Sequence, residues 1–199
     1  MSLFAKPQSK LVIRKLTAVS GVDVPAQDAP ILVRKDSGDG MTPILVIKQE
    51  QLPFQRMPEA TVTGIVAVSS VHGQRYFDKQ GDSLDTEQLH VLAKALMRGE
   101  ACFNPMHLNH PDGTPIDAGY CTEALVIDKR LAKAMNIPLP GGRECLIASF
   151  RVTDPTTLKM LESGVLTGFS IQGEGVRTPV TKSAGPAQST INAVMGFEF

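Results

Sequence analysis

The feature that most constrains the fold is a series of short β-branched runs, separated by glycine, proline and aspartate. The clearest run is Thr-Val-Thr-Gly-Ile-Val-Ala-Val-Ser at residues 61–69. Branched side chains favour strands because they fit a pleated, half-buried surface. The pattern predicts strands at residues 10–19, 31–35, 43–49, 61–69, 118–127 and 145–152.

Two other segments predict helices. Apolar residues recur at helical spacing in residues 86–98, with Asp85 as the expected N-cap and Gly99 just after the last turn. A shorter helix is expected between an Asp154 cap and a stop at Gly164. The chain therefore combines many strands with few helices, which indicates an α+β fold.

The length and composition suit one globular domain with trailing ends. The chain has 199 residues, 42% of them hydrophobic, and no apolar run approaches the twenty or so residues of a membrane span. The first residues show no secretory signal, so we expect synthesis inside the cell. We expect residues 1–57 to form a strand-rich segment packed on the main domain, residues 58–177 to form the core, and residues 178–199 to form a low-complexity tail.

Charge and cysteine content exclude further classes. Lys+Arg and Asp+Glu balance at 20 each, so a broad basic surface for nucleic acid is not expected. The three cysteines are an odd number at irregular spacing, which indicates reduced thiols instead of a disulfide scaffold. We therefore expect neither a membrane nor a specific nucleic acid among the partners.

One serine and one histidine pair suggest a nucleophile and its base. Ser170 lies in Thr-Gly-Phe-Ser-Ile-Gln-Gly at residues 167–173, and His107 and His110 lie about sixty residues earlier. A hydroxyl is a weak nucleophile near neutral pH unless an imidazole takes its proton. A serine on a glycine-flanked strand end therefore needs a histidine from elsewhere in the fold.

Metal binding is the competing chemistry. Cys102, His107, His110 and Cys121 offer two thiol and two imidazole ligands within twenty residues, but without the close pair at each end that a structural zinc site has. Asp78, Asp82 and Asp85 fit a calcium loop poorly, because no glutamate closes it. We expect no metal and no cofactor.

An ordered set of short motifs gives the chain a family resemblance. The set comprises an opening segment at residues 16–27, Asp-Lys-Gln-Gly-Asp at 78–82, Asn-His at 109–110, Gly-Tyr-Cys-Thr-Glu at 119–123, and Gly-Val-Leu-Thr-Gly-Phe-Ser-Ile-Gln-Gly at 164–173. This order resembles the tailed-phage prohead serine proteases, most closely their prophage-type branch. The resemblance covers roughly residues 10–35 and 60–177.

The resemblance implies a mainly antiparallel β-barrel of the herpesvirus-assemblin type, with a few helices around it. It also implies an endopeptidase that cuts scaffold and capsid proteins inside the prohead, in the host cytoplasm, within a homo-oligomer or larger assembly. Ser170 would be the nucleophile and His110 the base. Asp82 and Glu123 are the candidate third residues, with His107 behind them.

A second hypothesis comes from a different class. The chain ends 29 residues after Ser170, in a low-complexity tail that leaves little material for a barrel wall. A virion or assembly protein with the protease fold would bind capsid or neighbouring subunits without cutting them. Fold resemblance alone does not separate the two functions.

Overall fold

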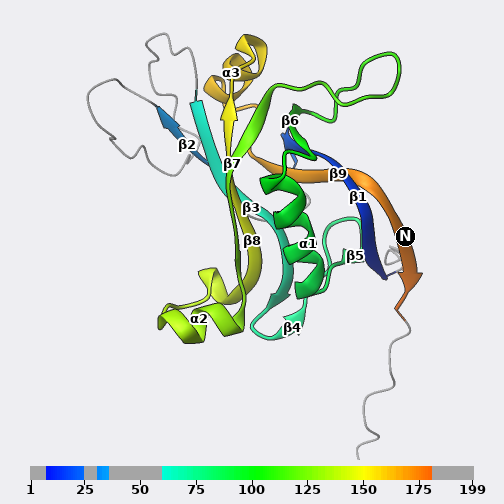
Figure 1. Cartoon of the computed structure of the whole chain (residues 1–199), viewed down its shortest axis with the longest axis vertical. Coiled ribbons are helices and arrows are strands. Elements are labelled where there is room, and N and C mark those ends of the chain that lie inside the picture. Colours follow the sequence, from blue (N-terminus) through cyan, green and yellow to red (C-terminus); the bar gives the residue numbers. More distant parts are fainter. Residues whose placement is uncertain (1–7, 25–30, 36–59, 181–199) are drawn as a thin grey trace, which may run out of the picture.

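A computed structural model describes residues 8–24, 31–35 and 60–180 (Figure 1). These residues form an α+β fold that is mostly strands, with three α-helices among them. The strands are β1 Ser9–Val22, β2 Ile31–Lys35, β3 Ala60–Val71, β4 Gln74–Arg75, β5 Asp82–Ser83, β6 Cys102–Pro105, β7 Gly119–Ile127, β8 Arg143–Val152 and β9 Gly168–Pro179. The helices are α1 Thr86–Met97, α2 Lys129–Met135 and α3 Pro155–Glu162.

The strands form one mixed sheet in the order β2-β3-β8-β7-β6-β1-β5. β9 pairs with β1 along almost its whole length, and β4 pairs with the end of β3. β1 runs parallel to β5 and β6, while the other pairs are antiparallel. The expectation of a mainly antiparallel barrel is therefore met only in part, because β1 returns to β6 through a long crossover and enters the sheet in the parallel sense.

The sheet curls into a half-barrel that leaves a seam between β3 and β9. The two strands approach each other, but no backbone ladder joins them in the described residues. Figure 1 shows α1 between the two halves of the curl, and it packs against β1, β3, β7 and β8. Its buried side chains are Leu89, Leu92, Ala95 and Leu96.

A cluster of three phenylalanines joins the two halves of the half-barrel. Phe103 of β6, Phe150 of β8 and Phe169 of β9 are each fully buried. Their ring centroids lie 5.3 to 6.1 Å apart, in tilted and edge-to-face arrangements that aromatic rings favour. Phe169 therefore fixes the start of β9, directly before Ser170.

Many of the sequence expectations are confirmed. Strands lie at or near the expected ranges, α1 ends before Gly99 at φ +71°, and Asp154 caps α3 by accepting hydrogen bonds from Thr157. α2 lies between two expected strands, in a segment for which no helix was expected. The strand expected at 43–49 lies outside the described residues.

The N-terminal strand is an integral part of the sheet. β1 is 14 residues long and lies between β6 and β9; it pairs with β9 from Ser9 to Val22 and with β6 from Ala18 to Gly21. β9 continues to Pro179, beyond the point where the sequence was expected to become a tail. Residues 181–199 lie outside the description.

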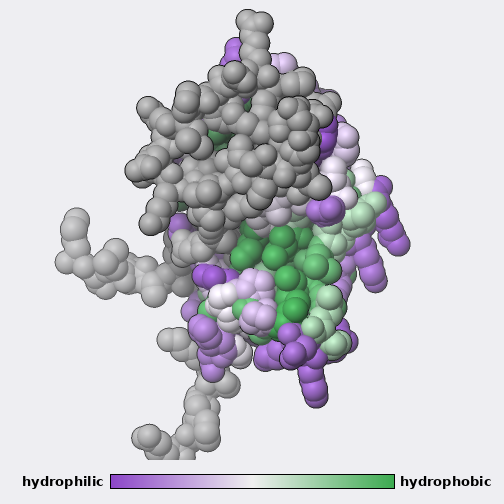
Figure 2. Space-filling model, turned by 90° about the vertical axis from the view of Figure 1, so that its left-hand side faces the viewer, coloured by the Kyte–Doolittle hydropathy of each residue, from purple (hydrophilic) through white to green (hydrophobic). Residues whose placement is uncertain are grey.

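The outer face of the sheet carries an apolar area. Figure 2 views the side of the molecule where β3, β7 and β8 lie, and it shows hydrophobic residues gathered there. On this stretch Ile65, Ile147 and Leu125 are direct neighbours in the ladder, and Leu125 is 53% exposed.

Among the described residues, no helix is long and apolar enough to cross a membrane.

Candidate active site

Ser170 differs from the other buried serines of the described residues. Its side chain is 6% exposed, yet its hydroxyl makes no hydrogen bond in that part of the chain. The hydroxyls of the other five buried serines among the described residues each make a hydrogen bond: Ser20, Ser69, Ser70, Ser83 and Ser149. Within the described residues, the fully buried side-chain oxygen that lacks a partner is Gln172 Oε1, so the unbonded Ser170 oxygen keeps contact with solvent and is accessible for binding or reaction.

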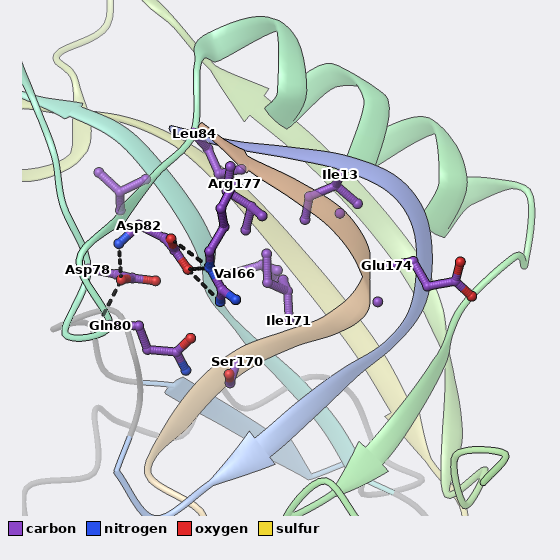
Figure 3. Close-up of a pocket in the computed structure, with 14 residues that line it drawn as sticks. Ile13, Val66, Asp78, Gln80, Asp82, Leu84, Ser170, Ile171, Glu174 and Arg177 are labelled. Atoms are coloured by element: carbon purple, nitrogen blue, oxygen red, sulfur yellow. Dashed lines mark hydrogen bonds and ion pairs between the residues drawn. The ribbon is translucent and has the colours of Figure 1, made fainter. Parts of the chain in front are cut away.

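Ser170 lines a cavity of about 200 Å³ in the seam between β3 and β9, here called the seam pocket (Figure 3). β1 and the loop before α1 complete its walls. The lining residues are Leu11, Ile13, Val66, Val68, Asp78, Gln80, Asp82, Leu84, Ser170, Ile171, Gly173, Glu174, Gly175 and Arg177. Two expected site residues, Ser170 and Asp82, therefore line one pocket.

Asp82 forms an ion pair at one side of this pocket. Arg177 donates to both carboxylate oxygens at 2.8 to 3.0 Å, and the Ser9 hydroxyl donates at 2.6 Å. Burial on its own raises the pKa of Asp82, but these hydrogen bonds and the charge of Arg177 outweigh it, so the pKa is lowered. Asp82 is thus an ionised partner of Arg177, and it makes no hydrogen bond to a histidine among the described residues.

His110 lies at the tip of a short hairpin between β6 and β7. The His110 N–H donates to Thr114 at 2.8 Å, and Gly113 donates back to the His110 carbonyl at 2.9 Å. The Asn104 amide holds the base of the hairpin by donating to the carbonyls of Leu108 and Ile116. The imidazole of His110 is exposed and makes no hydrogen bond to Ser170 or to any other described residue.

One hydrogen bond ties this hairpin to the serine strand. The Gln172 amide, two residues after Ser170, donates to the Asn109 side chain at 3.1 Å. Residues two apart on a strand share a face, so Ser170 lies on the face that the hairpin contacts. His110 follows Asn109 directly, but it lies in the turn of the hairpin and its imidazole makes no hydrogen bond to β9. The structure brings the hairpin to β9 without bringing the imidazole to the hydroxyl.

The base of the hairpin has an unusual backbone. Met106 and His107 have φ values of 51° and 57°, in the left-handed region that side chains other than glycine, asparagine and aspartate rarely adopt. His107 itself is exposed. Two successive residues of this kind store strain at the point where the hairpin leaves the sheet.

Glu123 lies away from the seam pocket. It is exposed on β7 and accepts a hydrogen bond from Ser149 at 3.0 Å. Ser149 in turn contacts Thr63, so the three residues form a polar row across β3, β8 and β7. This row does not include Ser170, His110 or His107.

The residues considered for metal binding do not converge. Among residues 8–24 and 60–180, no group of three His, Cys, Asp or Glu side chains is placed to hold an ion. The thiols of Cys102 and Cys121 face backbone carbonyls, and burial raises the pKa of each. Asp85 was one of the three aspartates considered for calcium, and it forms ion pairs with Lys10 and Arg75 instead.

Two pocket residues were missed by the sequence interpretation. Arg177 was the last residue of the expected core and was not considered for the site, because the Thr-, Pro- and Gly-rich composition after Val176 hid the continuing strand. Asp78 was considered only for a calcium loop; its carboxylate accepts the Gln80 N–H, and the residue also lines the pocket. Gly173, Gly175 and Arg177 are spaced two residues apart, which is the period of one face of a strand. This spacing could have indicated that the strand continues to Arg177.

Comparison of the chain with protein-family models, curated proteins and solved structures gives no match.

Proposed function

We propose that the protein is a serine endopeptidase of phage capsid maturation that cleaves scaffold and capsid proteins inside the prohead. The observation that carries this proposal is the hydroxyl of Ser170, which makes no hydrogen bond within the described residues and stands at a pocket wall, on the strand to which the His110 hairpin is bonded. The resemblance of the motif order to prohead proteases adds the substrate class. The curled half-barrel is compatible with an assemblin-like barrel.

In the proposed reaction, the Ser170 oxygen attacks the scissile carbonyl while His110 takes the hydroxyl proton. His110 then gives that proton to the leaving amine, and water releases the acyl group by the same route in reverse. The imidazole has to come within hydrogen-bond reach of the hydroxyl for this chemistry. The strained residues Met106 and His107 are the hinge through which substrate or assembly would turn the hairpin tip.

The third catalytic group is part of the same proposal. Asp82 accepts from Arg177 and Ser9, and Glu123 accepts from Ser149, so both carboxylates have partners in this state. Loss of a third group usually slows such a reaction less than loss of the nucleophile or base. Asp82→Asn and Glu123→Gln therefore test this role, with residual activity as the expected result.

The decisive experiment is co-expression of the chain with its own capsid and scaffold proteins, followed by intact-mass analysis. Cleavage products are expected with the wild type and should vanish with Ser170→Ala and with His110→Gln. Ser163→Ala is the matched control, because Ser163 is an exposed serine at the end of α3 and lies outside the seam pocket. It should cleave as the wild type does.

A binding function without cleavage is the second candidate. The exposed His110 imidazole, which has no bond to Ser170, favours it. Under this reading the chain is a virion or assembly protein that holds capsid or neighbouring subunits. Unchanged full-length masses with all variants, with the chain retained in assembled particles, would establish this function and remove the catalytic assignment.

A further inference from the structure

The seam pocket has an apolar floor and a polar end. Six aliphatic side chains supply the floor: Leu11, Ile13, Val66, Val68, Leu84 and Ile171. Figure 3 shows Asp78, Gln80 and Ser170 on one side of the cavity, with Val66 and Ile171 deeper in it. A cavity of about 200 Å³ is large enough for one long side chain. Its shape and lining suit a ligand with an apolar stem and a polar tip.

Asp78 is a carboxylate held in place without a counter-ion bonded to it. Its Oδ1 accepts the backbone N–H groups of Gln80 at 2.8 Å and Asp82 at 2.9 Å, which fixes the orientation of the side chain. Its Oδ2 makes no hydrogen bond within the described residues. Burial raises the pKa of Asp78 more than the backbone hydrogen bonds lower it, as expected for a partly buried carboxylate that lacks a bonded cation.

The neighbouring charges leave Asp78 exposed to a ligand cation. Arg177 directs its hydrogen bonds to Asp82 and also attracts Asp78 through its charge, so the three groups together leave one net negative charge for a ligand cation. Glu174 also lines the pocket, but Figure 3 shows its carboxylate pointing away from the cavity. Ser170, a buried residue whose hydroxyl makes no hydrogen bond within the described residues, lines the same cavity and is the second group available to a ligand there.

We propose that the seam pocket binds a lysine or arginine side chain of the protein substrate, with the methylene stem on the aliphatic floor and the cation at Asp78. The proposal rests on the proposed function, because it makes the pocket a specificity subsite beside the nucleophile Ser170. A long basic side chain has both an apolar stem and a charged head. A neutral side chain of equal length would fill the floor and leave Asp78 without a partner.

Binding of n-butylammonium tests the pocket without any cleavage. Titration of the 15N-labelled full chain should shift the amide signals of Val66, Gly173 and Gly175, while 1-butanol at the same concentration should shift them far less. Asp78→Asn keeps the Oδ1 acceptor and removes the charge, and it should weaken butylammonium binding about tenfold. Glu162→Gln removes an exposed charge outside the pocket and should change nothing. Equal shifts with both probes, or unchanged affinity in Asp78→Asn, would overturn the proposal.

Two diphenyl phosphonates, analogues of lysine and of norleucine, test the link to catalysis. The Ser170 oxygen forms a bond to phosphorus, one phenoxide leaves, and the serine proton passes through His110 to give phenol. The lysine analogue should label Ser170 at least about tenfold faster, and Asp78→Asn should remove that preference.

The outcomes separate the two proposals. Labelling of Ser170 at equal rates by both phosphonates would keep the protease and reject the basic subsite. No labelling, together with butylammonium binding that depends on Asp78, would keep the cation pocket and reject catalysis by Ser170. Absence of both labelling and binding would reject both.

Discussion

At the residue scale, the ion pair between Asp82 and Arg177 is the interaction that most directly shapes the pocket. The Asp82 side chain is almost fully buried, while the Arg177 side chain is 61% exposed. Removing one partner of a fully buried pair costs about 3 to 5 kcal/mol, because the other charge stays behind unpaired. Solvent screens the exposed Arg177, so we expect Arg177→Ala to cost about 1 to 3 kcal/mol. Urea unfolding of the single and double variants with Asp82→Asn measures the coupling, and a cost below about 0.5 kcal/mol would show that water replaces the arginine fully.

The same pair predicts a pH dependence of stability. The pKa of Asp82 is lower in the folded chain than in the unfolded chain, so ionised Asp82 stabilises the fold above its unfolded pKa. This contribution is lost as the pH falls through the lower, folded value. The stability advantage of the wild type over Asp82→Asn should therefore be full at pH 7 and shrink below about pH 4. Asp128, whose pKa is also lowered, is present in both chains and cancels in the comparison. An advantage that grew on acidification would contradict the assignment.

At the element scale, two aspartates that look alike in the sequence have different roles. Asp154 caps α3 through bonds to the Thr157 N–H and hydroxyl, as expected. Asp85 precedes α1 and its backbone carbonyl accepts from Gln88 and Leu89, but its side chain makes no capping bond, because Lys10 and Arg75 hold the carboxylate. Loss of an N-cap typically costs about 1 kcal/mol. Asp154→Ala should therefore lower the free energy of unfolding by about that amount through helix α3, and its exchange protection should fall locally. Asp85→Ala should leave the first turn of α1 protected, and unprotected amides there would show that Asp85 caps in solution.

These elements show what local sequence can and cannot predict. The strands and α1 are predicted well because their apolar residues follow the period of a single element. α2 was missed because seven residues give too short a period, and because Asn136 takes the left-handed position after the helix where glycine is the usual signal. The capping role of Asp85 failed because its basic partners come from distant positions in the chain. Local patterns carry no information on such long-range competition.

At the scale of the whole molecule, the order of the strands could not be predicted. β1 pairs with β9 across a separation of almost the full described chain, and with β6 in the parallel sense. Neither of these strand pairings can be predicted from a short window of sequence. The resemblance named both Ser170 and Asp82, which line one pocket, but it could not show that Arg177 lines that pocket too or that His110 makes no bond to Ser170. These features depend on the curl of the sheet and on the free edge of β9.

The phenylalanine cluster determines whether that curl holds. Phe169 is fully buried and contacts Phe103 of β6 and Phe150 of β8, so one side chain ties the edge strand to both halves. Phe169→Ala leaves a cavity at this junction and should lower the free energy of unfolding by about 3 to 5 kcal/mol. Val176→Ala, on the exposed part of the same strand, is the matched control and should cost less than about 0.5 kcal/mol. Urea unfolding gives both values, and hydrogen exchange of Phe169→Ala should rise first in β9. A cost below about 1 kcal/mol would mean that the β1 ladder alone holds β9, and that Ser170 does not depend on the core for its position.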